Sequence, residues 1–299
     1  MKKVVFTGSG VALVTPMKQD GSINYEMLNQ LIEFHIKNKT DAIIACATTG
    51  ESPVLNHDEH CKAIKYIVDH VNKRIPVIAS SGSNDTNYAV ELSRTAKDLG
   101  ADALLMVTPY YNKTSQSGLV KHYHYVADRV DLPIIVYNVP SRTGCNIKPE
   151  TYLSLSEHPN IVATKEANGD ISSVAKTISL CGDNLTVYSG NDDQTLPMLV
   201  LGGKGIISVF ANIMPNIMHK ICEDYFTGNI AASRQASLQY FELMEALFMD
   251  VNPIPVKAAM KMLGADCGDC RLPLTVMTSE GLAKLAAVLK KYQLSSLSL

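Results

Sequence analysis

Lys165 is the residue whose position in this sequence most clearly indicates chemistry. It follows the apolar run 161–163, inside the segment IVATKEANGD at residues 161–170. Burying an ammonium group there is costly unless the group is paired or neutral. Burial favours the neutral amine, which is a nucleophile toward carbonyl carbon. The position therefore predicts a lysine that forms a Schiff base. The alternative is a buried ion pair with Glu166 or another acid.

Three further groups at the ends of apolar runs suit this chemistry. The hydroxyl of Tyr137 could move protons at the carbinolamine and iminium stages. Thr48 and Thr49 offer hydroxyl and backbone N–H groups to a carboxylate, and the planar fork of Arg142 suits a second carboxylate. Each group also has a purely structural alternative. Tyr137 could be an aromatic side chain that fills the mouth of a barrel, Thr48 and Thr49 could belong to an ordinary turn, and Arg142 could be a surface residue.

Short apolar segments that alternate with amphipathic segments would position these residues. Eight segments are predicted to be strands buried on both faces, namely 10–16, 41–49, 75–82, 101–109, 132–140, 160–167, 185–191 and 205–212. Helices are predicted at 25–38, 57–71, 88–100, 118–130 and 170–182, with Asn56, Asn84 and Asp170 as N-caps. This order predicts an α/β protein with a (β/α)8 TIM barrel and a site at the carboxyl ends of its strands. A doubly wound sheet is the alternative, but no G-x-G-x-x-G follows the first strand.

The strand pattern ends before residue 229, and helical patterns continue at 231–248, 253–263 and 278–293. Asn252-Pro253 is a predicted break between the first two of these helices. We therefore predict a catalytic barrel domain over residues 1–228 and a C-terminal helical domain of about three helices over residues 229–299.

Composition favours a small-molecule partner. The chain has 299 residues and a net charge of −2, which provides no field that would attract nucleic acid or an anionic membrane. It contains no apolar run long enough for a transmembrane helix and no secretory signal. Its seven cysteines do not suggest a disulfide framework and fit the reducing cytoplasm.

Five motifs in order carry a specific resemblance. They are TTGE at 48–51, PYYNK at 109–113, YNVPSRTG at 137–144, TKEA at 164–167 and SGND at 189–192. Over essentially the whole chain the sequence resembles the 4-hydroxy-tetrahydrodipicolinate synthase family, also called dihydrodipicolinate synthase. The resemblance implies condensation of pyruvate with L-aspartate 4-semialdehyde, the first committed step of the diaminopimelate route to lysine. It implies a Schiff-base-forming lyase, for which we expect neither a cofactor nor a metal.

The resemblance also assigns catalytic roles. Lys165 matches the Schiff-base lysine, and Thr49, Tyr137 and Tyr111 match a proton-relay triad. In the family, the tyrosine at the Tyr111 position reaches in from a neighbouring subunit. A homodimer would then be the smallest active unit, and a tetramer built as a dimer of dimers is the expected assembly.

Binding roles follow in the same way. Thr48 and Thr49 match the cradle for the pyruvate carboxylate, and Arg142 matches the residue that receives the semialdehyde carboxylate. Gly190 and Ile207 match main-chain contacts near the substrate.

A regulatory site for lysine is implied at the dimer interface of some family members. The matching positions are Ser52, His57, His60, Asn84 and Tyr110. This chain has Tyr88 in place of a glutamate that can pair the amino group of lysine. Losing such a charge-assisted contact would weaken binding at least tenfold. We therefore expect weak or absent inhibition by lysine.

The nearest alternative function is a sister aldolase on the same barrel, such as N-acetylneuraminate lyase or a 2-keto-3-deoxy sugar acid aldolase. These enzymes share the pyruvate Schiff base, but the sialate lyases carry a G-S-T-G-E pattern where this chain has TTGE, and they lack an arginine at the Arg142 position. A non-catalytic pyruvate-binding protein is a further alternative, although it would not need the nucleophilic lysine.

A metal or redox protein is an alternative from another class. His122 and His124 are two residues apart on a predicted helix and would point away from each other. His57 and His60 do not form an H-E-x-x-H motif, and the Cys267–Cys270 pair has no second pair near it. We therefore expect no metal requirement.

Overall fold

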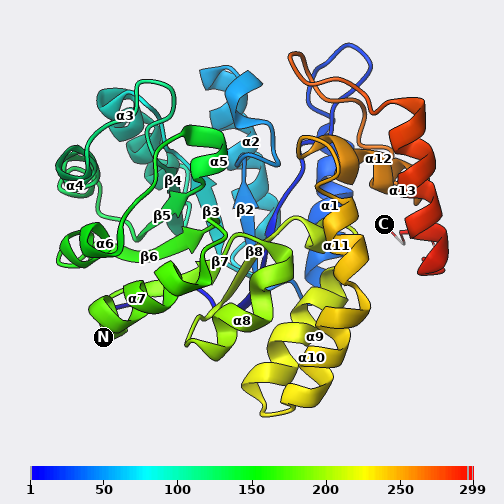
Figure 1. Cartoon of the computed structure of the whole chain (residues 1–299). Helices are drawn as coiled ribbons and strands as arrows, with labels where there is room; N and C mark the ends of the chain where they lie inside the picture. The colour runs from blue at the N-terminus through cyan, green and yellow to red at the C-terminus, as the bar shows by residue number, and fades with distance from the viewer. Residues whose placement is uncertain (1, 295, 298) are drawn as a thin grey trace.

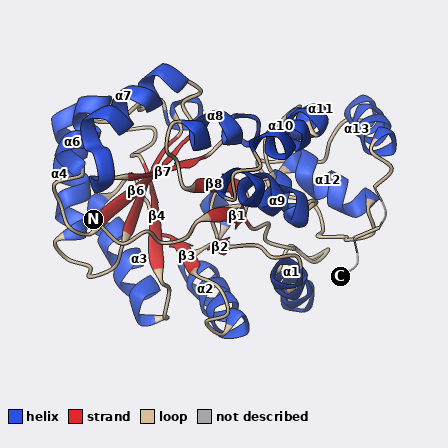
Figure 2. Cartoon of the chain, turned by 90° about the horizontal axis from the view of Figure 1, so that it is seen from below, coloured by secondary structure: helices blue, strands red, loops and turns tan. Residues whose placement is uncertain are grey.

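The predicted barrel is confirmed by the computed structural model, which describes residues 2–294, 296, 297 and 299. Eight parallel strands close into a barrel in sequence order, and Figure 2 shows them at the centre of a ring of helices. The strands are β1 (Gly8–Ala12), β2 (Ala42–Ala45), β3 (Val77–Ser80), β4 (Ala103–Val107), β5 (Ile134–Asn138), β6 (Ile161–Glu166), β7 (Thr186–Ser189) and β8 (Gly205–Ser208). Nearly all of their residues are buried, which explains why these strands are continuously apolar in sequence.

The helices around the barrel follow the strands in alternation. They are α1 (Tyr25–Lys37), α2 (His57–Val71), α3 (Thr86–Asp98), α4 (Gln116–Ala127), α5 (Pro140–Thr143), α6 (Pro149–Leu155), α7 (Ile171–Cys181), α8 (Thr195–Val200) and α9 (Pro215–Phe226). Asn56 and Asp170 cap α2 and α7 as predicted. The predicted cap Asn84 is wrong, because the side chain of Asp85 accepts the first N–H groups of α3. The weaker helical pattern at 148–159 corresponds to α6, whereas α5, α8 and α9 had no counterpart among the predicted helices.

The end of the barrel opposite the strand carboxyl ends is closed by the N-terminal segment. The Phe6 ring stacks on the Tyr188 ring with centroids 4.3 Å apart. The Tyr188 hydroxyl donates to the Phe6 carbonyl oxygen and accepts from the Phe6 N–H. Both residues belong to the apolar cluster that fills the barrel, together with Ile207 and Tyr137. The N-terminal segment therefore packs against the barrel interior at the end opposite the carboxyl ends of the strands.

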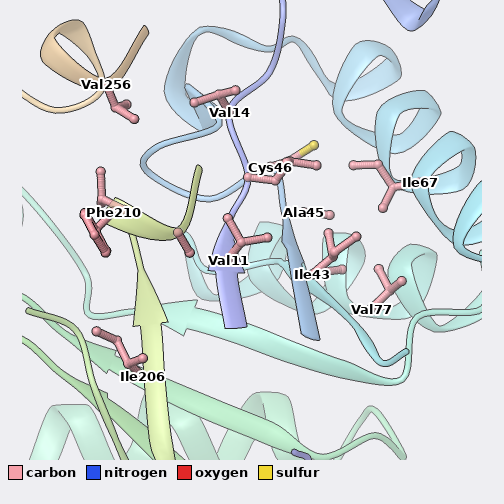
Figure 3. Packing of buried hydrophobic residues seen from close by; sticks show 14 of the residues in the cluster. Val11, Val14, Ile43, Ala45, Cys46, Ile67, Val77, Ile206, Phe210 and Val256 are labelled. Carbon is pink, nitrogen blue, oxygen red and sulfur yellow. The ribbon is translucent and has the colours of Figure 1, made fainter. Parts of the chain in front are cut away.

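The C-terminal helices are α10 (Ile230–Gln239), α11 (Phe241–Ala246), α12 (Ile254–Met262) and α13 (Ser279–Lys291), which lie together on one side of the barrel (Figure 1). The first predicted helix of this segment is divided at Tyr240 into α10 and α11. Val256 of α12 packs in the same buried cluster as Val14 and Phe210, and Figure 3 shows the three side chains near the top of β1 and β8. The division into domains at residues 228 and 229 stays a prediction. In the described part of the chain, no helix is both long and apolar enough to cross a membrane.

Candidate active site

Strand β6 directs two adjacent ionisable residues to opposite faces of the barrel wall. Successive side chains of a strand alternate in direction. Lys165 points into the barrel, where its Nζ lies 4.3 Å from the centroid of the Tyr137 ring on β5. Tyr137 and Lys165 are direct partners in the β5–β6 register. The strand pairing therefore places the two predicted catalytic side chains side by side.

Glu166 points outward and is held by other partners. Its carboxylate accepts hydrogen bonds from the Tyr152 hydroxyl at 2.7 Å, from the Asn138 amide at 2.9 and 3.1 Å and from the Asn168 N–H at 2.9 Å. Within residues 2–294, 296, 297 and 299, no acidic side chain forms a salt bridge with Lys165. The alternative of a buried ion pair of Lys165 with Glu166 or another acid is therefore wrong.

The environment of Lys165 favours its neutral amine. The residue is 4% exposed, and burial lowers its pKa from 10.5 to about 7, with the charge of Arg142 acting in the same direction. Asp192 acts in the opposite direction, but its carboxylate is already bonded by the Ser208 hydroxyl and by two backbone N–H groups at 3.2 and 3.0 Å. A large fraction of Lys165 is therefore unprotonated near neutral pH, as a nucleophilic amine requires.

Thr48 and Thr49, which follow β2, have different partners. A hydrogen bond with Thr48 and the charge of Arg142 partly oppose the rise in the Tyr137 pKa that burial causes. The Thr49 hydroxyl oxygen instead accepts a hydrogen bond of 3.0 Å from the side-chain amide of Asn252. Thr48 lines the same cavity as Tyr137, and the assignment of Thr49 to the proton relay stays a prediction.

Gly190 and Ile207 line the surroundings of the lysine. A Cβ atom on Gly190 would lie 3.1 Å from Cε of Lys165 and 2.7 Å from Cβ of Ala167, so this position has no room for a side chain. Ile207 on β8 is fully buried in the cluster that fills the barrel. Both residues lie close to the barrel interior, and their main-chain contacts with the substrate stay a prediction.

A cavity of about 560 Å³ leads from the barrel mouth to the surface, and Thr48, Tyr137 and Arg142 line it. Arg142 is on the short helix α5, and its Nη2 donates to the carbonyl oxygen of Asn252 at 3.2 Å. Tyr111 does not line this cavity; its side chain is 92% exposed and its φ is 67°. One chain alone therefore does not bring Tyr111 to the site.

Four of the five predicted regulatory residues, Ser52, His57, His60 and Tyr110, line the outer part of the same cavity. The fifth, Asn84, lines a separate hollow. The Tyr88 hydroxyl also lies in the cavity, 3.3 Å from Nδ1 of His57.

The histidine and cysteine motifs considered for metal or redox chemistry do not come together in one site. Nδ1 of His122 is bonded to the Thr86 hydroxyl at 2.9 Å, and burial raises the pKa of both the Cys267 and the Cys270 thiol to about 12. In the part of the chain that the structure describes, no three His, Cys, Asp or Glu side chains are grouped so that they could hold a metal ion.

Sequence reasoning missed Asn252, whose side chain reaches Thr49 and whose backbone holds Arg142. The sequence indicated only a break at Asn252-Pro253. No local pattern could pair Asn252 with Thr49, because the two residues are 203 positions apart.

A closed parallel barrel with a buried lysine of lowered pKa, a tyrosine beside it and an arginine at the cavity mouth defines a Schiff-base-forming barrel lyase. A family model described as the dihydrodipicolinate synthetase family matches residues 5–292. This chain belongs to that family.

Individual relatives agree with this assignment. The 4-hydroxy-tetrahydrodipicolinate synthase of Acetivibrio thermocellus is 52% identical over 98% of this chain and 100% of its own length. Among solved structures, dihydrodipicolinate synthase from Aquifex aeolicus superposes with a TM-score of 0.95 at 46% identity, covering 97% of this chain and 99% of its own. The chloride-inhibited enzyme from Acinetobacter baumannii, complexed with pyruvate, gives a TM-score of 0.95 at 42% identity, with the same coverage.

Proposed function

We infer that this chain condenses pyruvate with L-aspartate 4-semialdehyde to give 4-hydroxy-tetrahydrodipicolinate, the first committed step of the diaminopimelate route to lysine. The observation that carries this function is the Lys165 amine inside the barrel, with its pKa lowered by burial and Tyr137 beside it. The family membership and the relative complexed with pyruvate support the choice of substrates.

The geometry supports the following sequence of steps. The neutral amine of Lys165 attacks C2 of pyruvate, and the carbinolamine loses water to form the Schiff base. Removal of a proton from C3 gives an enamine, which attacks the aldehyde carbon of the second substrate. The amine of that substrate then displaces Lys165 from C2, which closes the ring and frees the lysine.

We propose that Tyr137 moves protons in these steps, and its ring, whose centroid is 4.3 Å from Nζ of Lys165, supports this role. We propose Thr48 as its neighbour in the relay, in place of Thr49, because Thr48 lines the same cavity as Tyr137, whereas the Thr49 hydroxyl is bonded to Asn252. Tyr111 would complete the relay from a second copy of the chain, because its exposed side chain is free to enter a neighbouring site. The active unit would then be a homodimer, with a tetramer of paired dimers as the full assembly.

The two carboxylates would bind at opposite ends of the cavity. The pyruvate carboxylate would take the backbone N–H groups and hydroxyls at Thr48 and Thr49, close to the main chain of Gly190 and Ile207. Arg142 at the mouth would take the carboxylate of the semialdehyde. A neutral sugar would not use this arginine, which argues against the sister aldolases.

Borohydride reduction in the presence of pyruvate, followed by intact-mass and peptide analysis, tests the proposal. We expect one pyruvate-derived adduct per chain on Lys165 and none in a Lys165→Met variant. Lys204→Met is the matched control, because Lys204 precedes β8 at the closed end of the barrel. An adduct on another lysine, or none, would refute the mechanism. Treatment with a chelator is expected to leave activity unchanged.

Regulation by lysine is expected to be weak. Tyr88 supplies a hydroxyl where lysine-binding members place a carboxylate, so the amino group of lysine would lack a charged partner. A Tyr88→Glu variant is expected to be inhibited at least tenfold more strongly by lysine than the unaltered enzyme. Equal inhibition of the two would show that another group binds the ligand. The enzyme is proposed to act in the cytoplasm.

A further inference from the structure

Asn252 connects the segment after the barrel to both predicted carboxylate-binding groups. It lies just before α12 and is only 5% exposed. Its side-chain Nδ2 donates to Oγ1 of Thr49 at 3.0 Å. Its backbone carbonyl oxygen accepts from Nη2 of Arg142 at 3.2 Å. A single buried residue thus contacts the pyruvate end and the semialdehyde end of the site.

The bond to Thr49 determines which way the Thr49 proton can point. A threonine hydroxyl has one proton to donate and two lone pairs that accept. Because Nδ2 of Asn252 is itself a donor, it occupies a lone pair of Oγ1 and cannot take the proton. The proton of Thr49 is then left for another acceptor, and a bound carboxylate is such an acceptor.

The other polar atom of the Asn252 amide is its oxygen, Oδ1. Oδ1 of Asn252 is buried and has no hydrogen-bond partner among the residues that the structure describes. Among the described residues, the bond from Nδ2 to Thr49 is the one hydrogen bond that the Asn252 side chain makes. The direction of this bond is what the variants below test.

We propose that Asn252 is a positioning residue for pyruvate: by donating to Thr49, it holds the Thr49 hydroxyl as a donor to the pyruvate carboxylate. This inference rests on the proposed function. It also makes the segment beyond the barrel part of the pyruvate site, although none of its side chains has been given a role in the reaction.

An Asn252→Asp variant tests the direction of the hydrogen bond. Aspartate has nearly the same shape, but its carboxylate only accepts, so it would draw the Thr49 proton away from pyruvate and present oxygen lone pairs instead. Because hydrogen bonds to charged groups are among the stronger ones, we expect KM for pyruvate to rise about tenfold or more. Asn252→Ala leaves the hydroxyl free to rotate, and we expect a smaller rise of about threefold.

A double-mutant cycle with Thr49→Val separates this role from others. If Asn252 acts through Thr49, its substitutions change KM for pyruvate little once the hydroxyl is gone. If the negative charge that Asn252→Asp introduces, or a general loss of structure, were responsible, the effect would persist in the Thr49→Val background. Equal effects in the two backgrounds would overturn the proposal, as would an Asn252→Asp enzyme with unchanged KM for pyruvate.

Controls keep the outcome separate from folding and from the proposed function. Ser233→Ala removes a buried hydrogen bond of 2.7 Å to the Ile221 carbonyl elsewhere in the C-terminal segment, and it should leave KM for pyruvate unchanged. Adduct formation on Lys165 at saturating pyruvate should persist in the Asn252 variants. Absence of the adduct in the unaltered enzyme would instead refute the proposed function itself.

Discussion

Replacing Lys165 with methionine should abolish catalysis and yet stabilise the fold near neutral pH. The pKa of Lys165 falls from 10.5 to about 7 on folding. Between these values the unfolded chain binds more protons than the native chain, so stability rises with pH. The loss in free energy of unfolding that burial of Lys165 causes is therefore largest below pH 7 and disappears above pH 10.5. Each pH unit below 10.5 favours the protonated unfolded chain by about 1.4 kcal/mol, which amounts to about 3 kcal/mol at pH 8.

Methionine has a similar length and no charge, so Lys165→Met should recover this cost without leaving a large cavity. Asp192 keeps its three hydrogen bonds in the variant. Denaturant unfolding at pH 6, 8 and 10 would measure the gain, with the exposed residue Lys204 changed to methionine as a control. The gain should shrink as the pH rises. A Lys165→Met chain that is less stable at pH 8, or a gain independent of pH, would refute the reasoning.

Three further outcomes follow from the site. The rate of adduct formation with pyruvate should rise as the pH increases through about 7 and then level off, because the neutral amine of Lys165 reacts; a rate that still climbs at pH 10 would mean an ordinary lysine. Gly190→Ala should block adduct formation in a folded protein, since its Cβ would lie 3.1 Å from Cε of Lys165. A pyruvate adduct of normal yield, found by mass analysis after borohydride reduction, would contradict this expectation. Lys257→Met should cost about 3–5 kcal/mol in denaturant unfolding, because it leaves Glu51 buried without its cation; a loss below about 1 kcal/mol would show that the pair is dispensable.

The barrel and the catalytic pair were predictable because they depend on local patterns. Buried strands are recognisable as apolar runs, and a lysine in such a run is conspicuous. Strand alternation then separates Lys165 from Glu166, and the β5–β6 register brings Tyr137 to Lys165. These relations involve neighbouring elements, so a sequence pattern contains them.

Other features depend on contacts that no local pattern encodes. Asn84 and Asp85 are adjacent and both can cap a helix, so only the backbone geometry decides that Asp85 does so. The different roles of Thr48 and Thr49 depend on the loop conformation after β2. Asn252 was missed because its partner lies in a distant part of the chain.

The loop after β2 is also anchored by residues that are made late. Lys257 donates to Glu51 at 2.8 Å in a pair whose side chains are 3% and 0% exposed, and the Arg271 N–H donates to the same carboxylate at 2.8 Å. These contacts span 206 and 220 residues. During synthesis, the eight strands and Lys165 leave the ribosome before any of these anchors exists. A nascent barrel would therefore carry its reactive amine before it has a finished place for a keto acid, and the ability to capture pyruvate would arise only after Lys257 and Arg271 have been added to the chain.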